Sequence, residues 1–305
     1  MSVDLELDGS AGPRGLTDEE LARSLPGEFH SRHAELDGVR LHYVEGGSGA
    51  PLFLLPGWPQ TWWEFRKIMP ALAERYRVIA VDLRGMGGSG RPDSGYDKKT
   101  MAGDILALAR QLGYDRVNLV GHDIGAMVAY SFTANHPEAI NRLALLDVVH
   151  PDESRYDMPL LPRPDRGFNM WWWAFNQVPE LPEKLIAGRM EHVIDWLFDN
   201  SLVDPASIGP ADRAVYARAY DSPEAIRATN RWYQAFHQDI EDIQSYGKFG
   251  VPLLGIASPV SHDQFQRLLP TLAPDVRVVK VDRALHWIPE EQPELVARAL
   301  TEFFG

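Results

Sequence analysis

The chain has 305 residues, of which 45% are hydrophobic and 24% are charged, so it can form one large domain with an insertion or two domains. Its formal net charge of −13 argues against nucleic acid or an anionic membrane surface as a partner. The absence of cysteine excludes disulfides, a cysteine nucleophile and thiolate zinc sites. No apolar run approaches the ~18 residues of a membrane helix. The acidic N-terminus lacks the features of a signal peptide, so we expect a cytoplasmic protein.

The first half of the chain alternates between strand and helix patterns. Residues 1–27 form an N-terminal leader with one helical candidate, LTDEELARSLP, and two alternating segments then meet at Asp37-Gly38, a hairpin signal. Short apolar runs typical of buried strands follow, separated by amphipathic stretches: PLFLLPG, helical WWEFRKIMPALAERY, YRVIAVDL, helical KKTMAGDILALARQLG, RVNLVGH, helical AMVAYSFTANH and INRLALLDVV. This rhythm predicts an α/β fold with a mostly parallel central sheet flanked by helices.

The alternation stops after this half and returns near the C-terminus. Between them lie a proline-rich stretch, the aromatic run FNMWWWAFNQ and several helical patterns. Strand patterns return at VPLLGIAS and VRVVKVD, and the helical PELVARALTEFF ends the chain. We therefore predict a core of residues 28–150 and 249–305, with a helical cap inserted at 151–248.

Four segments follow predicted strands, at the sheet edge where open α/β folds place their sites. They are PGWPQ, GHDIG, Asp147 after LALL, and His286 after the last strand. In GHDIGA, residues 121–126, small residues flank Asp123 between a strand and a helix. This pattern is typical of a sharp turn that displays a nucleophile. The alternative is an aspartate that merely caps a helix.

These segments resemble the α/β-hydrolase superfamily, in particular its aspartate-nucleophile branch of epoxide hydrolases and haloalkane or haloacetate dehalogenases. The matching segments are LLPGWPQTWWEF, VDLRGMGGSGRPDSGY, VGHDIGAMVAY, LLDVVHP and ALHWIPEEQPE, and the likeness extends from about Glu28 onward, cap included. It implies an α/β-hydrolase fold with an inserted helical cap. It also implies a reaction that needs neither a cofactor nor a metal.

The chemistry of a carboxylate explains why Asp123 would replace the serine common at such turns. The N-terminus of the following helix favours its ionised form. Attack on an ester would give a reactive anhydride, whereas attack on a strained or polarised sp³ carbon gives an alkyl ester, a viable covalent intermediate. Asp123 therefore suits epoxides and carbon–halogen bonds.

The resemblance assigns the remaining catalytic roles. His286 would remove a proton from the water that attacks the ester, and the backbone N–H groups of Trp58 and Ile124 would form the oxyanion hole. Many relatives place the acid that orients the histidine where this chain has Ser258. We favour Asp147, which matches the position used by several dehalogenases and some epoxide hydrolases. Asp263, where a helix could also begin, is the second choice.

The cap residues bear on the choice of reaction. Tyr233, in NRWYQAF, matches the cap tyrosine that in epoxide hydrolases gives a hydrogen bond and then a proton to the ring oxygen; it could also be a packing aromatic. The second cap tyrosine of many epoxide hydrolases corresponds to a place among Met170–Trp173, which we assign to Trp171. Trp171 and Trp172 are our predicted pocket residues. An indole N–H can hold an oxygen or a halide but is not a practical proton source.

Two absences weigh against dehalogenation. Haloalkane dehalogenases usually have tryptophan directly after the nucleophile, and haloacetate dehalogenases have arginines in the same turn and helix. Here Ile124 and Met127 stand there, which favours a neutral substrate. We expect an epoxide hydrolase that forms a vicinal diol from a small, apolar or aromatic epoxide. The alternatives are a hydrolytic dehalogenase using Asp123 and a non-catalytic small-molecule receptor on this fold. A homodimer is the default expectation for the oligomeric state.

Overall fold

The computed structural model describes residues 15–158 and 170–305. Eight strands form one sheet in the order β1-β2-β4-β3-β5-β6-β7-β8. β1 pairs antiparallel with β2, and β2 with β4, while all pairs from β4 to β8 are parallel. The strands are β1 (Phe29–Leu36), β2 (Val39–Gly46), β3 (Ala50–Leu55), β4 (Tyr76–Val81), β5 (Val117–His122), β6 (Ile140–Leu146), β7 (Leu253–Ala257) and β8 (Val276–Lys280). The predicted α/β fold with a mostly parallel central sheet is confirmed.

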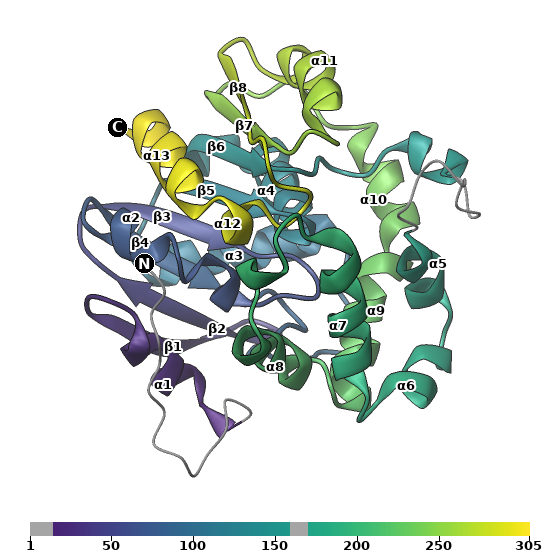
Figure 1. Ribbon diagram of the computed structural model, residues 1–305. Coiled ribbons are helices and arrows are strands. Elements are labelled where there is room, and N and C mark those ends of the chain that lie inside the picture. Colours follow the sequence, from purple (N-terminus) through teal and green to yellow (C-terminus); the bar gives the residue numbers. More distant parts are fainter. Residues whose placement is uncertain (1–14, 159–169) are drawn as a thin grey trace.

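Helices flank this sheet (Figure 1). α4 (Ile124–Asn135) packs on β3, β5 and β6 with α3 (Lys98–Gln111) beside it, α2 (Met69–Ala73) packs on β4, and α11 (His262–Leu272) packs on β7 and β8. α12 (Ile288–Glu291) and α13 (Pro293–Phe304) end the chain, and α1 (Asp18–Ser24) precedes β1. Most of the predicted N-terminal leader, residues 1–14, lies outside the described residues.

One predicted helix is divided in the structure. The segment WWEFRKIMPALAERY forms a short 3₁₀ helix, η2 (Trp62–Phe65), and then α2. Pro70 stands in the first turn of α2. Because proline has no N–H and clashes with the preceding turn, it starts a helix well but cannot continue one.

Among the described residues, six α-helices lie between β6 and β7 and are called the cap helices below. They are α5 (Trp171–Gln177), α6 (Leu181–Ile186), α7 (Met190–Ser201), α8 (Pro210–Ala219), α9 (Pro223–Gln234) and α10 (Phe236–Ile243). In Figure 1 they gather in green on one side of the sheet. Part of the proline-rich stretch that precedes them, residues 159–169, lies outside the described residues.

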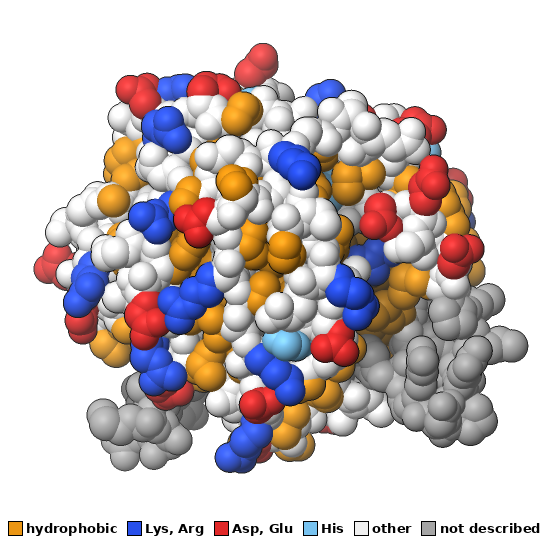
Figure 2. Space-filling view, turned by 90° about the horizontal axis from the view of Figure 1, so that it is seen from above, with side chains coloured by type: hydrophobic (Ala, Val, Ile, Leu, Met, Phe, Trp, Pro, Cys, Tyr) orange, Lys and Arg blue, Asp and Glu red, His pale blue; other side chains and the backbone are white. Residues whose placement is uncertain are grey.

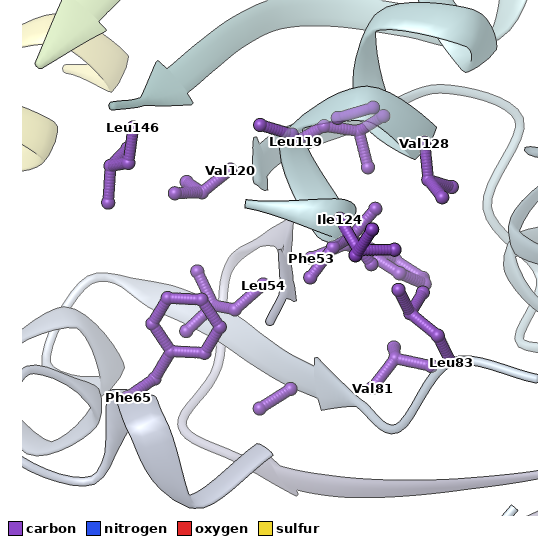
Figure 3. Packing of buried hydrophobic residues seen from close by; sticks show 14 of the residues in the cluster. Phe53, Leu54, Phe65, Val81, Leu83, Leu119, Val120, Ile124, Val128 and Leu146 are labelled. Carbon is purple, nitrogen blue, oxygen red and sulfur yellow. The ribbon is translucent and has the colours of Figure 1, made fainter. Parts of the chain in front are cut away.

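The central strands are buried on both faces. Every residue of β5 is buried, as is usual when helices cover both faces of a parallel sheet. The side chain of Ile124, 1% exposed, belongs to the same core, and Figure 3 shows it near Phe53. The core thus extends to the residue that directly follows Asp123.

The molecular surface carries both charge signs. On the face seen in Figure 2, acidic and basic side chains are interspersed with hydrophobic ones, so the net negative charge does not gather there as one patch. Among the described residues, no helix is long and apolar enough to cross a membrane.

Ion pairs, one of them fully buried, join the cap helices to the core. Lys98 at the start of α3 and Asp239 in α10 are both fully buried, with Nζ 2.7 Å from Oδ2. The same ammonium donates to the carbonyl of Trp232 at 2.8 Å. On another side of the cap, Arg66 lies 2.7 Å from Asp212 of α8.

We predict that Lys98→Met destabilises the protein by about 3–5 kcal/mol, because it leaves the Asp239 carboxylate buried without its counter-ion. Denaturant unfolding measures this change. The matched control is Lys280→Met, since Lys280 and its partner Asp282 are 46% and 76% exposed. The control should change the stability by less than ~0.5 kcal/mol. Equal effects of the two substitutions would contradict the anchoring role of Lys98.

Candidate active site

Asp123 occupies a strained turn between β5 and α4. Its backbone has φ 49° and ψ −120°, a conformation that non-glycine residues rarely adopt. The turn also brings backbones together. A Cβ atom on Gly121 would overlap the carbonyl of Gly125, and one on Gly125 would overlap the carbonyl of Leu55. The small residues on both sides of Asp123 are therefore a steric requirement of the turn.

The loop after β3 presents a backbone donor to this aspartate. Trp58 N–H donates to Asp123 Oδ1 at 2.9 Å. Gly57 allows the approach, because a Cβ atom there would overlap the Asp123 side chain. The N–H of Ile124 also hydrogen-bonds the carboxylate. Both backbone groups predicted for the oxyanion hole thus face Asp123.

His286 lies between two carboxylates. Its Nε2 is 3.6 Å from Asp123 Oδ2, and its Nδ1 is 2.9 Å from Asp147 Oδ2. The other Asp147 oxygen accepts the N–H of Ser258 at 2.9 Å and the hydroxyl of Ser261. Asp147 is thereby held on both oxygens, with one of them turned toward the histidine.

Asp263 lies in a different environment. It stands in the first turn of α11, its side chain is 85% exposed, and its Oδ1 lies 3.6 Å from His262 Nδ1. Of the two acids predicted to orient His286, the structure brings only Asp147 to it.

The charges of these groups are coupled. Burial lowers the pKa of His286, but the hydrogen bonds and charges of Asp123 and Asp147 outweigh it and raise that pKa to about 10. Burial raises the pKa of Asp123, but His286 outweighs it and lowers that pKa below its usual value. Near neutral pH the resting site therefore holds an imidazolium between two carboxylates. The His286 side chain remains 29% exposed, so water can reach it.

Tyr233 in α9 faces this site from the cap. It is 2% exposed, and its ring meets the Trp58 ring edge-on with centroids 5.8 Å apart. Burial and the nearby Asp123 raise the pKa of Tyr233 well above its ordinary value. The phenol therefore stays protonated and available as a hydrogen-bond donor.

Of the two predicted tryptophans, Trp172 is the one beside Tyr233. Its indole stacks on Trp58 at 6.5 Å and its side chain hydrogen-bonds Tyr233. Trp171 instead contacts Phe175 and Trp196. Adjacent helical residues point about 100° apart, so only one of them can share the direction toward Tyr233. The structure brings Trp172 to Tyr233, and the assignment of the second cap tyrosine's place to Trp171 stays a prediction.

Two residues of this region were not predicted. Glu64 in η2 and His122 at the end of β5 are both fully buried, with Glu64 Oε1 2.8 Å from His122 Nδ1. Two features of the sequence could have pointed to them: Glu64 is an acidic residue inside the aromatic segment WWEF, and His122 directly precedes Asp123.

A surface hollow of about 1220 Å³ lies elsewhere, on the cap. Its lining comes from α7, α8 and their neighbouring loops, and includes Asp195, Asp199 and Arg213. None of its lining residues belongs to the constellation around Asp123, so we assign no chemistry to it.

Comparison with known protein families confirms the predicted α/β-hydrolase fold. The model of the alpha/beta hydrolase fold family matches residues 50–293, and the chain belongs to this family.

Comparison with known proteins narrows the class. The chain is 32% identical to the soluble epoxide hydrolase of Corynebacterium sp. (strain C12), over 91% of this chain and 98% of that protein. It is 29% identical to a fluoroacetate dehalogenase of Burkholderia sp., over 91% and 94% of the two chains. Among solved structures it is similar to Cfl2 from Burkholderia cenocepacia, with a TM-score of 0.82 and 36% identity over 91% and 96% of the two chains. The protein is a hydrolase of the α/β-hydrolase family.

We predict that Asp123→Asn lowers the pKa of His286 below about 10, because one of the two carboxylates that stabilise the imidazolium is removed. Titration of the ¹⁵N-labelled histidine ring by NMR measures the change. Asp263→Asn is the control and should leave the titration of His286 where it is. An unchanged pKa in Asp123→Asn would show that the two side chains are not electrostatically coupled.

Proposed function

We propose that the protein is an epoxide hydrolase that converts an epoxide to a vicinal diol through a covalent alkyl ester on Asp123. The observation that carries the proposal is the facing pair of Asp123 and Tyr233, a carboxylate and a protonated phenol that both border Trp58. Opening an epoxide requires a nucleophile at carbon and a proton donor at oxygen. The similarity to the soluble epoxide hydrolase of Corynebacterium supports the same reaction.

In the first half of the reaction, an Asp123 oxygen bonds to one ring carbon as the carbon–oxygen bond of the epoxide breaks. Tyr233 donates a hydrogen bond and then its proton to the departing oxygen. Trp172, which hydrogen-bonds Tyr233, assists by stabilising the phenolate. The product of this half is a hydroxyalkyl ester of Asp123.

In the second half, His286 becomes the general base. Ester formation removes the negative charge of Asp123, so the pKa of His286 falls and the imidazolium releases a proton that restores Tyr233 through solvent. Oriented by Asp147, the neutral ring then takes a proton from water, which attacks the ester carbonyl carbon. The N–H groups of Trp58 and Ile124 stabilise the oxyanion. Its collapse breaks the ester bond to the substrate oxygen, and the proton of the new carboxyl group passes to the departing alkoxide. The diol leaves, with Asp123 ionised and His286 protonated as at the start.

The residues around Asp123 favour a neutral, apolar or aromatic substrate. Trp58, Trp172 and Tyr233 offer aromatic surfaces, and Trp173 meets the Tyr233 ring at 6.2 Å. Met127, one turn along α4 from Asp123, is fully buried and apolar. No charged side chain therefore occupies the helix positions from which a substrate carboxylate would be clamped.

Hydrolytic dehalogenation through Asp123 is the second candidate. The observation that favours it is the Trp172 indole beside Tyr233 and Trp58, since an indole N–H can hold a departing halide. The fluoroacetate dehalogenase among the relatives agrees with this alternative.

The experiment that separates the two is intact-protein mass spectrometry of His286→Gln after exposure to a mixed panel of epoxides and organohalides. We expect a mass gain equal to a whole epoxide, located on the peptide that contains Asp123, because the ester forms and cannot be hydrolysed. A gain equal to a halide substrate minus its hydrogen halide would establish dehalogenation instead. The double variant Asp123→Asn/His286→Gln is the control and should gain no mass.

Tyr233→Phe tests the proton donor. We expect it to slow ester formation from epoxides by about 10²-fold or more, because general acid catalysis is lost while the ring's packing is kept. Single-turnover mass spectrometry in the His286→Gln background measures this step directly. Trp171→Phe is the matched control from the same aromatic region and should retain the rate. Unimpaired ester formation in Tyr233→Phe would remove Tyr233 from the donor role.

A further inference from the structure

A buried pair of titratable side chains borders the reacting groups without taking part in the scheme above. Glu64 and His122 both have fully buried side chains, although they come from elements far apart in sequence. Charged groups removed from water are costly unless each of their polar atoms has a partner. The partners of this pair are therefore informative.

Glu64 contacts two parts of the site. Its Oε2 accepts the N–H of Gly57 at 3.1 Å, directly before Trp58 in the loop that supplies a backbone donor to Asp123. Its Oε1 lies 2.8 Å from His122 Nδ1. Neither of these two atoms has another hydrogen-bond partner among the described residues, so each is the other's nearest polar contact.

His122 reaches the third part of the site. Its Nε2 lies 2.9 Å from the backbone carbonyl of His286, and the two imidazole rings are 4.7 Å apart. A carbonyl oxygen can only accept, so Nε2 must carry a proton. His122 therefore donates to the backbone of the residue whose side chain stands between Asp123 and Asp147.

We propose that Glu64 and His122 form a buried pair of positioning residues that holds the oxyanion loop and the base in register with Asp123. The carboxylate of Glu64 fixes the loop through Gly57 and the ring of His122. His122 Nε2–H fixes the main chain of His286, so that the imidazole of His286 keeps its place between the two carboxylates. Both residues act through the main chain and do not touch the substrate. The inference rests on the proposed function for the tests that measure turnover, but not for a test made without substrate.

Two isosteric substitutions separate the contacts of His122. In His122→Gln the side-chain amide N–H₂ lies near the former Nε2 and can still donate to the His286 carbonyl. In His122→Asn the amide lies near the former Nδ1, so the contact with Glu64 is kept and the bond to His286 is lost. We expect His122→Asn to slow hydrolysis of the Asp123 ester by about 10²-fold, as misplacement of a catalytic group does. His122→Gln keeps the bond to His286 and loses the contact with Glu64, so it should slow ester hydrolysis much less than His122→Asn does.

The readout is the fraction of enzyme that carries an epoxide adduct during turnover, measured by intact mass. His122→Asn should accumulate the adduct, because ester formation does not use His286 as a base. His150→Asn is the control, since His150 is also buried but packs on Tyr130 and Tyr246. The positioning role would be overturned if His122→Asn and His122→Gln carried the adduct in equal fractions. It would also be overturned if His122→Asn hydrolysed the adduct as fast as the wild type does.

A measurement without substrate keeps the proposal testable if the reaction is another one. The Nδ1–H proton of His286, bonded to Asp147, should give a protected downfield NMR resonance in the wild type and in His122→Gln. We expect this resonance to broaden or exchange rapidly in His122→Asn. Its persistence there would overturn the positioning role, whatever the substrate is. Failure of His286→Gln to trap any epoxide would instead count against the proposed function alone.

Discussion

The site depends on one strained residue. Holding a non-glycine residue at φ 49° costs on the order of 1–3 kcal/mol, so surrounding structure must enforce it. Burial of the next side chain, Ile124, contributes about 1.5–3 kcal/mol and ties the start of α4 to the core. The two terms are similar in size. The turn is therefore kept by the packing of β5 and α4, and Asp123 is displayed as a consequence.

The same turn determines the electrostatics. Because Asp123 is held beside both His286 and two backbone N–H groups, it is ionised at rest although it is buried. The imidazolium of His286 depends in turn on the negative charges of Asp123 and Asp147. A reaction that converts Asp123 into a neutral ester would therefore lower the pKa of His286. Forming the ester would in this way prepare His286 to act as the base in the next step.

The sequence predicted what local patterns determine. The turn around Asp123 requires small residues at fixed spacing, and strand–helix alternation requires a parallel sheet, so both could be recognised along the chain. The choice between Asp147 and Asp263 could not be made locally, because it depends on how closely β6 and the loop after β8 approach. Trp172 and Trp171 differ only in helical phase, which a short aromatic run does not define. Glu64 and His122 were missed because their partners lie far away along the chain.

The cap adds a constraint of another kind, since Tyr233 must be held above Asp123 by an element outside the core. The residue before it, Trp232, is bound from two directions: its carbonyl accepts the buried ammonium of Lys98, and its indole donates to the Arg84 carbonyl at 2.9 Å. Both partners belong to the core. A buried lysine is a costly way to join two elements unless its position matters, because its charge must be balanced by Asp239 in the cap. The Lys98–Asp239 pair thus places the main chain of α9 at the point where its next side chain faces the nucleophile.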